Sequence, residues 1–223
     1  MIMGAWGLGR RRGWTNPYIT DGLVAMWDGE WNVGGGVHDG TASQWLDVVG
    51  SRTLLLNGSA AFGANYMETT DSASGAIGNF DLNAAYFEMV FYVDKTSDWY
   101  SIFDGLSGKW VWGDPVYSGA SDGGINELYW QGWSIPNIQG VMQICMSFDG
   151  AVCTANGRSV SVDMAYGGDD AIGPFSIFGN VDNIGEERCC CGKCFSARFY
   201  GAIPNVSQRS LNLEIDRTRF SLP

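Results

Sequence analysis

Turn residues divide this chain into many short apolar segments. Glycine makes up 32 of its 223 residues. The pair Asp149-Gly150 separates two neighbouring apolar segments, and Asn156-Gly157 follows directly after the second. Pairs of this kind favour the tight turns of β-hairpins, and short apolar segments between turn signals are typical of strands. The chain is therefore expected to fold mainly from strands.

The run Tyr86–Val93, with the sequence YFEMVFYV, is the strongest strand signal. Aromatic and β-branched residues favour strands, so this segment is expected at the centre of a sheet. About a dozen such segments, with one short helical turn at 207–213, predict an all-β fold, a two-sheet antiparallel β-sandwich. The other predicted strands are 22–27, 43–49, 52–56, 60–62, 66–69, 101–104, 109–112, 127–130, 141–148, 151–154, 176–179 and 194–202.

The first seventeen residues differ from the rest of the chain. They are rich in glycine, tryptophan and arginine and show no periodicity, which predicts an N-terminal arm over 1–17 beside one β-sandwich domain over 18–223. The arm is expected to dock on another protein subunit through Trp6, Arg10, Arg11, Arg12 and Trp14. A secretory signal places its basic residues before a longer apolar stretch, whereas here the arginines come after a short one. Synthesis in the cytosol without a signal peptide is therefore expected.

The net charge of the chain limits the kinds of partner that it is expected to bind. A net charge of −11 and a pI near 4.3 would repel phosphate backbones, so nucleic acid is not an expected partner. No apolar run approaches the roughly 20 residues that a membrane-spanning helix needs.

Several segments carry a resemblance to a known family. The stretches DGLVAMWDG, SQWLDVVGSRTLLLNGSAAF and MQICMSFDGAVCTANGRSV, together with FSIFGN and the tail from Cys194, resemble laminin-G-like domains of the concanavalin A-like lectin and glucanase superfamily. The similarity extends over 18–223 and is strongest to stand-alone members from gut bacteria and phages. It implies a jelly-roll sandwich. Because one fold hosts many functions, the chemistry has to be judged from individual residues.

The residues do not favour catalysis. The glucanases of this superfamily carry Glu-x-Asp-x-x-Glu on a strand, and retaining glycosidases need a close pair of carboxyl groups. Both Glu214-Ile215-Asp216 and Asp28-Gly29-Glu30 lack the further acid. His38 is the only histidine, so a serine or cysteine catalyst could be built only around it. The chain is therefore expected not to be an enzyme.

Glycan binding needs an aromatic face for stacking and planar polar groups for the hydroxyls. The best cluster of this kind is Trp130, Gln131 and Trp133, followed by Trp31 with Asn32. The alternative is that Trp130 and Trp133 pack a long loop onto the sheet.

None of these interpretations requires a cofactor. Metal binding is a separate question, with two possible sites. The resemblance implies calcium at the rim of the sandwich, where acidic loop residues supply oxygen ligands; the candidates are Asp28, Asp39, Asp169 and Asp170. Four clustered cysteines could hold zinc, form a local disulfide, or stay reduced, which is the favoured alternative; these are Cys189, Cys190, Cys191 and Cys194.

The cellular compartment expected for this chain favours one function over the others. Domains of this fold usually meet ligands outside cells, whereas the expected cytosolic synthesis and the cysteine cluster suit a reducing environment. A structural or decoration protein of a phage or prophage virion, with lectin-like adhesion to surface glycans, reconciles the two. The alternatives are a soluble carbohydrate-binding module and a glycoside hydrolase of the glucanase type.

Overall fold

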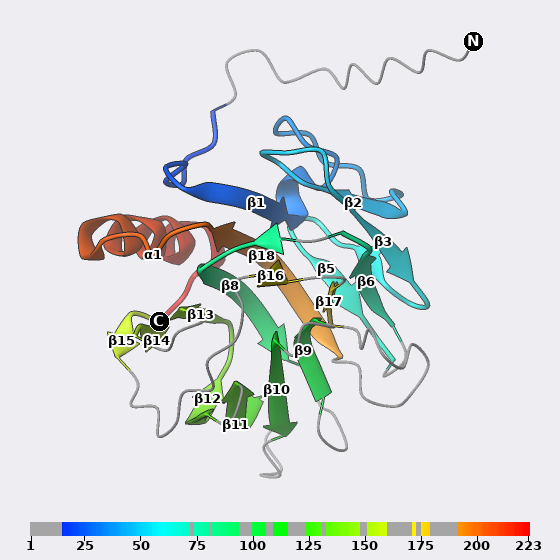
Figure 1. Cartoon of the computed structure of the whole chain (residues 1–223). Coiled ribbons are helices and arrows are strands. Elements are labelled where there is room, and N and C mark those ends of the chain that lie inside the picture. The colour runs from blue at the N-terminus through cyan, green and yellow to red at the C-terminus, as the bar shows by residue number, and fades with distance from the viewer. Residues whose placement is uncertain are drawn as a thin grey trace.

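The computed structural model of the chain consists mainly of antiparallel sheets, with one helix near the C-terminus (Figure 1). It describes residues 15–71, 74–80, 82–93, 100–105, 109–115, 124–130, 133–147, 151–159, 171–172, 175–178 and 191–223. In these residues the strands form two large sheets and one small one. The predicted all-β fold with two antiparallel sheets is confirmed.

The first large sheet, sheet A, has the strand order β15-β14-β13-β8-β18-β5-β4, and β1 also pairs with β18. Its strands are β1 (Leu23–Asp28), β4 (Ala61–Phe62), β5 (Met67–Thr69), β8 (Tyr86–Val93), β13 (Met142–Ser147), β14 (Cys153–Ala155), β15 (Arg158–Ser159) and β18 (Gly192–Tyr200).

The second large sheet, sheet B, has the order β12-β11-β10-β9-β17-β6-β3-β2. Its strands are β2 (Gln44–Leu46), β3 (Thr53–Asn57), β6 (Gly75–Gly78), β9 (Tyr100–Gly105), β10 (Lys109–Pro115), β11 (Gly124–Trp130), β12 (Trp133–Gln139) and β17 (Phe175–Ile177). The small sheet pairs β7 (Leu82–Asn83) with β16 (Ala171–Ile172). A 3-10 helix, Gly29–Trp31, follows β1.

The strand β8 has the predicted bounds and lies between β13 and β18, in the interior of sheet A. Side chains alternate across a strand, and β8 is covered on both faces. Phe87, Met89 and Phe91 belong to the main hydrophobic core, whereas Val90 packs in a second cluster with Phe220 of the C-terminal helix. A strand that is buried on both faces reads as a nearly continuous apolar run, and this one is interrupted by the buried Glu88.

Aromatic rings fill the main core. The rings of Trp27 and Phe80 stack with their centroids 5.8 Å apart, and the edge of Phe199 meets Trp27 at 5.9 Å. Trp45 packs edge-on against Phe62 at 5.7 Å. Such rings bury large apolar areas, and their pairs add about 0.5–1.5 kcal/mol beyond the burial itself. The core therefore lies between the two sheets, as a sandwich requires.

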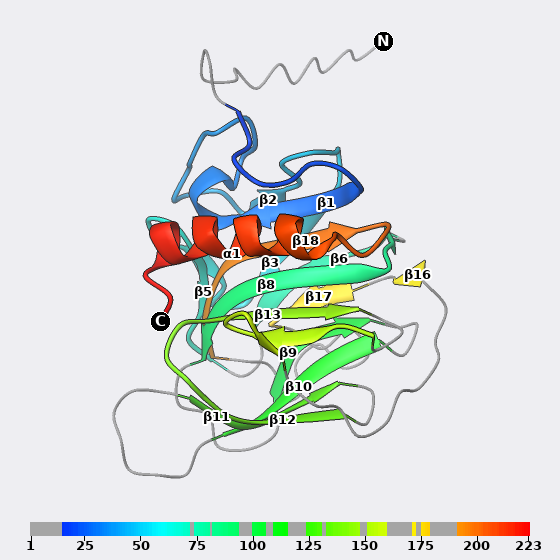
Figure 2. The same cartoon turned by 90° about the vertical axis from the view of Figure 1, so that its left-hand side faces the viewer.

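The C-terminal helix is longer than predicted. The expectation of one turn at 207–213 is wrong, because α1 extends over Val206–Phe220. A reciprocal capping box between Asn205 and Gln208 begins the helix, and Ser221 ends it in the left-handed conformation. The side chains of Asn212 and Asp216 lie on its buried face, so the apolar period that identifies a helix in a sequence is missing. Figure 2 shows α1 lying across sheet A.

The structure describes one of the two predicted turns, because Asp149 and Gly150 lie outside the described residues. Asn156 and Gly157 both have positive φ, 48° and 78°, and join β14 to β15, which confirms the predicted tight turn. In the neighbouring hairpin Cys145 pairs with Thr154, and Cys153 pairs with Met146. The two cysteines therefore lie on opposite faces of the sheet.

Strands with weak signals were missed by the sequence analysis. β12 contains a proline, and β6, with the sequence GAIG, contains two glycines in four residues. A Cβ on Gly78 would lie 2.6 Å from the Phe80 ring and 2.7 Å from Leu54, so a larger residue there would force these two side chains to move. β7, β15 and β16 have two residues each and were also not predicted.

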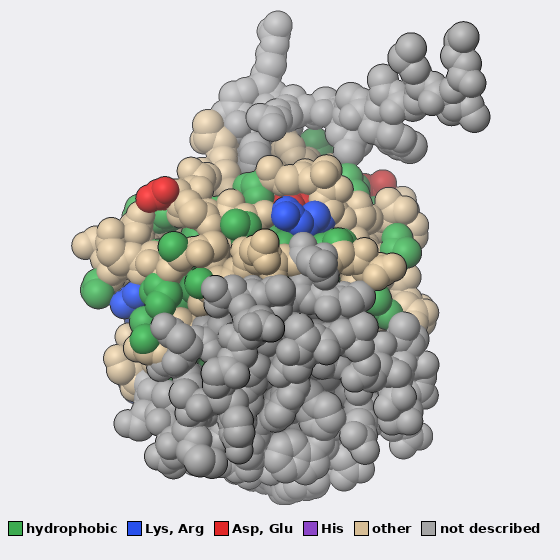
Figure 3. Space-filling model, viewed as in Figure 1, with side chains coloured by type: hydrophobic (Ala, Val, Ile, Leu, Met, Phe, Trp, Pro, Cys, Tyr) green, Lys and Arg blue, Asp and Glu red, His purple; other side chains and the backbone are tan. Residues whose placement is uncertain are grey.

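The described surface carries few charged side chains on the face seen in Figure 3. Among the described residues, no helix is long and apolar enough to cross a membrane.

Candidate functional site

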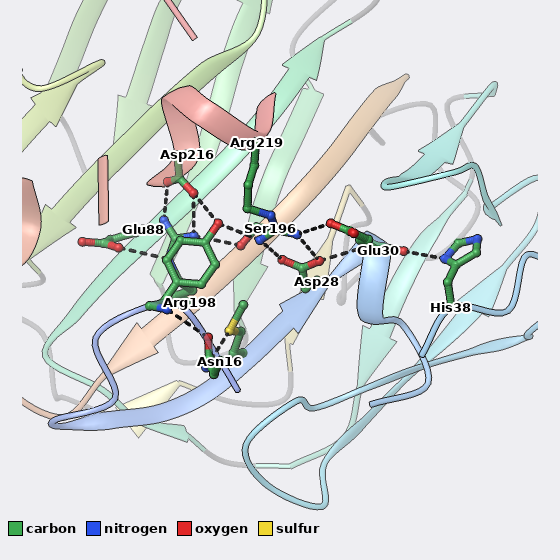
Figure 4. A network of polar contacts seen from close by, with 12 residues as sticks. Asn16, Asp28, Glu30, His38, Glu88, Ser196, Arg198, Asp216 and Arg219 are labelled. Atoms are coloured by element: carbon green, nitrogen blue, oxygen red, sulfur yellow. Dashed lines mark hydrogen bonds and ion pairs between the residues drawn. The ribbon is translucent and has the colours of Figure 1, made fainter. Parts of the chain in front are cut away.

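The densest polar chemistry in the described residues is a network beneath α1 (Figure 4). Arg198 of β18 lies at its centre. Its Nε donates to Glu88 Oε2 at 3.0 Å, and its Nη1 and Nη2 donate to Asp216 Oδ1 and Oδ2 at 2.9 and 2.5 Å. All three side chains have 0% exposure. One arginine thus joins the central strand of sheet A to the helix.

Further hydrogen bonds extend this network to the N-terminal segment. The Tyr18 hydroxyl donates to Asp216 Oδ1 at 2.6 Å, and the Ile19 amide donates to Asn212 Oδ1 at 3.0 Å. Asn212 Nδ2 donates to Glu88 Oε2 at 2.9 Å. Gln143 of β13 donates to Asp216 Oδ2 at 2.6 Å. Helix, sheet and N-terminal segment are therefore held by the same buried groups.

A second arginine holds the end of β1. Arg219 Nη1 and Nη2 donate to the two carboxylate oxygens of Asp28 at 2.8 and 2.9 Å, and Nη2 also donates to Glu30 Oε2 at 2.9 Å. The guanidinium lies over the Trp31 ring, 4.1 Å from its centroid. Nη1 donates to the Tyr18 hydroxyl at 2.7 Å, which links this cluster to the first.

Burial sets the acid–base properties of the network. It raises the pKa of Glu88, and the nearby Arg198 counteracts this only in part. Burial also raises the pKa of Asp28, against the hydrogen bonds from Arg219. Two guanidinium groups face three fully buried carboxyl groups, those of Asp28, Glu88 and Asp216. Burial therefore favours the protonated form of Glu88 and of Asp28.

This network is a structural clamp. A carboxyl pair that cleaves a glycosidic bond must be reached by the sugar and by water. Glu88 and Asp216 are both fully buried and both bound to Arg198. Glu214 and Asp216 lie on a helix rather than on a strand, with Glu214 exposed and Asp216 buried. The segment Glu214-Ile215-Asp216, which is the most similar to the glucanase motif, thus contributes a structural contact through Asp216.

Three of the predicted site residues are engaged in contacts within the protein itself. Trp31 is 8% exposed, beneath Arg219. Asn32 is fully buried and exchanges two hydrogen bonds with the backbone of Asp39, at 2.7 and 2.8 Å. Asp28, a predicted calcium ligand, has both oxygens bound by Arg219. The positions of Trp31 and Asn32 do not favour sugar contact, and that of Asp28 does not favour calcium.

The remaining predicted metal ligands are dispersed. Asp39 is exposed, and its carboxylate accepts from the amide and hydroxyl of Thr41. Cys194 is a thiol buried in the core, whereas Cys191 is partly exposed. Within the described ranges, no group of three or more histidine, cysteine or acidic side chains is arranged to hold a metal ion. Several predicted residues lie outside the described residues, namely Trp6, Arg10, Arg11, Arg12, Trp14, Gln131, Asp169, Asp170, Cys189 and Cys190.

The best predicted glycan cluster is described only in its backbone. The register of β11 and β12 places Trp130 directly opposite Trp133. The two tryptophan positions are therefore adjacent at the closed end of a hairpin. The long loop expected between the predicted strands 127–130 and 141–148 is largely replaced by β12, which begins at Trp133.

A groove that the sequence analysis missed lies along β3 and β6 of sheet B and the residues that flank these strands. Its volume is about 780 Å³. In the register Leu55 lies opposite Ile77, and both line the groove together with Phe80, whose ring also stacks on Trp27 of the core. Leu55 is 55% exposed. The other lining residues are Ser51, Arg52, Thr53, Leu56, Asn57 and Asn79.

The groove arises from the alternation of β3. Leu54 faces the core, whereas Thr53, Leu55 and Asn57 face outward. Three consecutive leucines in a strand must place at least one on the opposite face from the others. The run Leu54–Leu56 was therefore a usable signal for an exposed apolar patch. An apolar floor with a few amide and charged groups is the usual composition of a small-molecule site.

Comparison with known proteins gives likeness in structure alone. No protein-family model matches the sequence, and no curated protein matches it. The chain is similar to Trypanosoma rangeli sialidase in complex with sialic acid, with a TM-score of 0.55 and 14% identity over 92% of this chain and 35% of the sialidase. A mutant of that sialidase with trans-sialidase activity has a TM-score of 0.52, also at 14% identity, over 87% of this chain and 33% of the mutant.

Botulinum neurotoxin type C, whose cell entry depends on interaction with two ganglioside molecules, gives a TM-score of 0.55 and 10% identity, over 87% of this chain and 51% of the toxin chain. The chain thus spans between a third and a half of the structures that it resembles. Likeness at this identity shows the fold. It contradicts the expectation that the chain is not an enzyme, because the matched structures include sialidases. That expectation is withdrawn, and the likeness assigns no reaction in its place.

Proposed function

We propose that this protein is a glycan-binding β-sandwich and that the groove along β3 and β6 is its binding surface. The observation that carries the proposal is the composition of the groove. An apolar floor of Leu55, Ile77 and Phe80 lies beside the amides of Asn57 and Asn79. A sugar presents the same two chemistries, a face of C–H groups and a ring of hydroxyls.

The groove is large enough for a sugar and is accessible from solvent. Its volume of about 780 Å³ falls within the usual range for ligand sites, roughly 300–1,000 Å³. The C–H face of a pyranose would pack on Phe80 and Leu55, while Asn57 and Asn79 would hydrogen-bond its hydroxyls. Both asparagines are exposed, so they can bind a ligand without unfolding the sheet.

The structural likenesses support a glycan as the ligand. The sialidase was studied with sialic acid and the toxin with gangliosides, and both share this fold. The support is indirect, since fold alone does not assign function. It agrees with the groove, which is argued from this chain's own residues.

A glycan array with matched variants tests the proposal. Leu55→Ala and Asn79→Ala change exposed groove residues and are expected to weaken binding at least about tenfold, the equivalent of roughly 1.4 kcal/mol. Leu211→Ala on α1 is the matched control, because Leu211 is 49% exposed and lies outside the groove. Equal binding by all three variants and the wild type would exclude the groove.

The Trp130–Trp133 hairpin is the second candidate for the binding surface. Trp130→Ala and Trp133→Ala on the same array separate the two places, since each pair of variants affects only its own surface. The virion role, the docking of the arm on other subunits and the cytosolic origin stay predictions. Residues 1–14, which carry the arm's tryptophans and arginines, lie outside the described residues.

A further inference from the structure

One charged residue distinguishes the groove from the rest of this acidic protein. Arg52 is the sole charged side chain among the described residues that line it. The whole chain has a net charge of −11. Arg52 therefore supplies the one cationic group of the described lining, in a protein with a large excess of acidic groups.

The backbone holds Arg52 in place. Its Nη1 donates to the carbonyl oxygen of Val24 at 2.8 Å and approaches Asp47 Oδ2 at 3.4 Å. Within the described part of the chain, Nη1 makes every hydrogen bond of this guanidinium. Its side chain is 34% exposed. The Nε and Nη2 groups of this partly exposed guanidinium are therefore the donors left for a ligand in the groove that Arg52 lines.

Asp47 forms a long ion pair with Arg52 and leaves the arginine's other N–H groups unused. Its carboxylate is fully buried, and its Oδ1 accepts from the amides of Met26 and Val49, both at 3.0 Å. Backbone donors therefore satisfy one of its oxygens. The contact of the other oxygen with Arg52 is long for a charge-assisted hydrogen bond, which is typically about 2.7–2.9 Å.

We propose that the groove selects a sugar that bears a carboxylate and that Arg52 is the residue that recognises it. This inference rests on the proposed glycan binding and specifies its ligand. A guanidinium presents paired N–H donors that match the two oxygens of a carboxylate. The amides of Asn57 and Asn79 take the hydroxyls, and the apolar floor takes the C–H face. Since the groove contains no described acidic residue, nothing in its lining repels the anion.

The first test needs no variant of the protein. Binding of the wild-type chain is measured by calorimetry to a trisaccharide ending in N-acetylneuraminic acid, and to the methyl ester of the same sugar. A second pair uses a glucuronic acid terminus and its ester, which distinguishes the two sources of the carboxylate. We expect each preferred acid to bind at least about tenfold more tightly than its ester, because a hydrogen bond to a charged group is lost.

The second test assigns the preference to Arg52. Arg52→Lys keeps the charge and removes the paired geometry, so it should lower the affinity for the acid while leaving that for the ester unchanged. Arg52→Gln should abolish the preference. Asn79→Ala should weaken acid and ester alike. Thermal unfolding of each variant checks that the contact with Val24 has not been essential for folding; Arg52→Lys serves where Arg52→Gln does not fold.

The outcomes separate the two proposals. Equal binding of acid and ester by the wild type overturns the selectivity and leaves glycan binding intact. A preference that survives in Arg52→Lys and Arg52→Gln overturns the role of Arg52. Failure to bind any sugar overturns the proposed function itself.

Discussion

Arg198 of β18 and Asp216 of α1 face each other in a paired hydrogen-bonded contact in which neither side chain has any exposed surface. The same arginine also holds Glu88 of β8. A buried charge is costly unless it is paired and hydrogen-bonded. The position of α1 on sheet A is therefore fixed by polar groups, with the apolar contact of Phe220 and Val90 beside them.

Removal of one partner should be severely destabilising. Asp216→Ala leaves Arg198 buried with Glu88 alone, and breaking a buried pair in this way costs about 3–5 kcal/mol. Urea unfolding followed by circular dichroism measures the loss. Glu214→Ala is the control on the same helix, because Glu214 is exposed; its stability should stay close to that of the wild type. If the two variants are equally stable, the clamp does not hold the helix.

The stability of the fold should fall as the pH rises above the acidic range. In the unfolded chain a glutamate has its ordinary pKa of about 4.3 and releases its proton near that pH. Burial raises the pKa of Glu88 in the folded protein, so the folded state binds more protons than the unfolded state between the two values. The free energy of unfolding then decreases with pH through that interval, by at most about 1.4 kcal/mol per pH unit for this group.

Glu88→Gln tests the origin of this decrease. Glutamine has the same shape and no titrating proton, so the fall in stability with pH should become shallower. Asp28, whose pKa burial also raises, should retain its own part of the slope. Urea midpoints are compared at a series of pH values from 4 upward. A slope that is unchanged in the variant would show that Glu88 does not hold the proton.

The fold could be predicted because its signals are local. Tyr86–Val93 has an unbroken strand composition, and Asn156-Gly157 has the turn chemistry that the left-handed backbone requires. The helix could not be predicted in length, because Asn212 and Asp216 on its buried face respond to Arg198 and Glu88, which are distant in the sequence. The hydrophobicity pattern of a segment does not show which distant polar residues its side chains will contact.

The candidate site was predicted less well, for a related reason. Trp31 and Asn32 have the residue types of a sugar site, yet Arg219 and Asp39 occupy them. Arg52 has no motif around it, and its place beside Leu55 and Asn79 follows from the pairing of β3 with β6. Residue type identifies what a side chain can bind. Only the three-dimensional neighbourhood shows which groups are already engaged.

A close backbone approach should make Gly29 intolerant of a side chain. A Cβ at this position would lie 2.4 Å from Tyr66 Cα and 2.5 Å from its amide nitrogen, so the backbone would have to shift. Gly29→Ala should cost roughly 1–3 kcal/mol, as overpacking does. Gly40→Ala is the control, because its Cβ would come no closer than 3.7 Å to any neighbour. Thermal unfolding of both variants compares them, and similar melting temperatures would argue against the predicted clash.

The described cysteines should differ sharply in reactivity. Burial raises the pKa of Cys153 to about 12 and also raises those of Cys145 and Cys194, and the reactive species is the thiolate. Cys191 is partly exposed and directly precedes β18. Iodoacetamide at neutral pH should therefore modify Cys191 in the folded protein well before the other three, as read by peptide mass spectrometry.

Labelling in urea is the control, since unfolding exposes all of the thiols and should remove the difference. Modification of Cys194 as fast as Cys191 under native conditions would mean that the end of β18 opens readily. Because Cys194 pairs in register with both Met67 and Phe91, such opening would detach β5 from sheet A. Protection of Cys191 that a chelator such as EDTA removes would instead indicate a metal held with the neighbouring cysteines, since thiolates bound to zinc are shielded from alkylation.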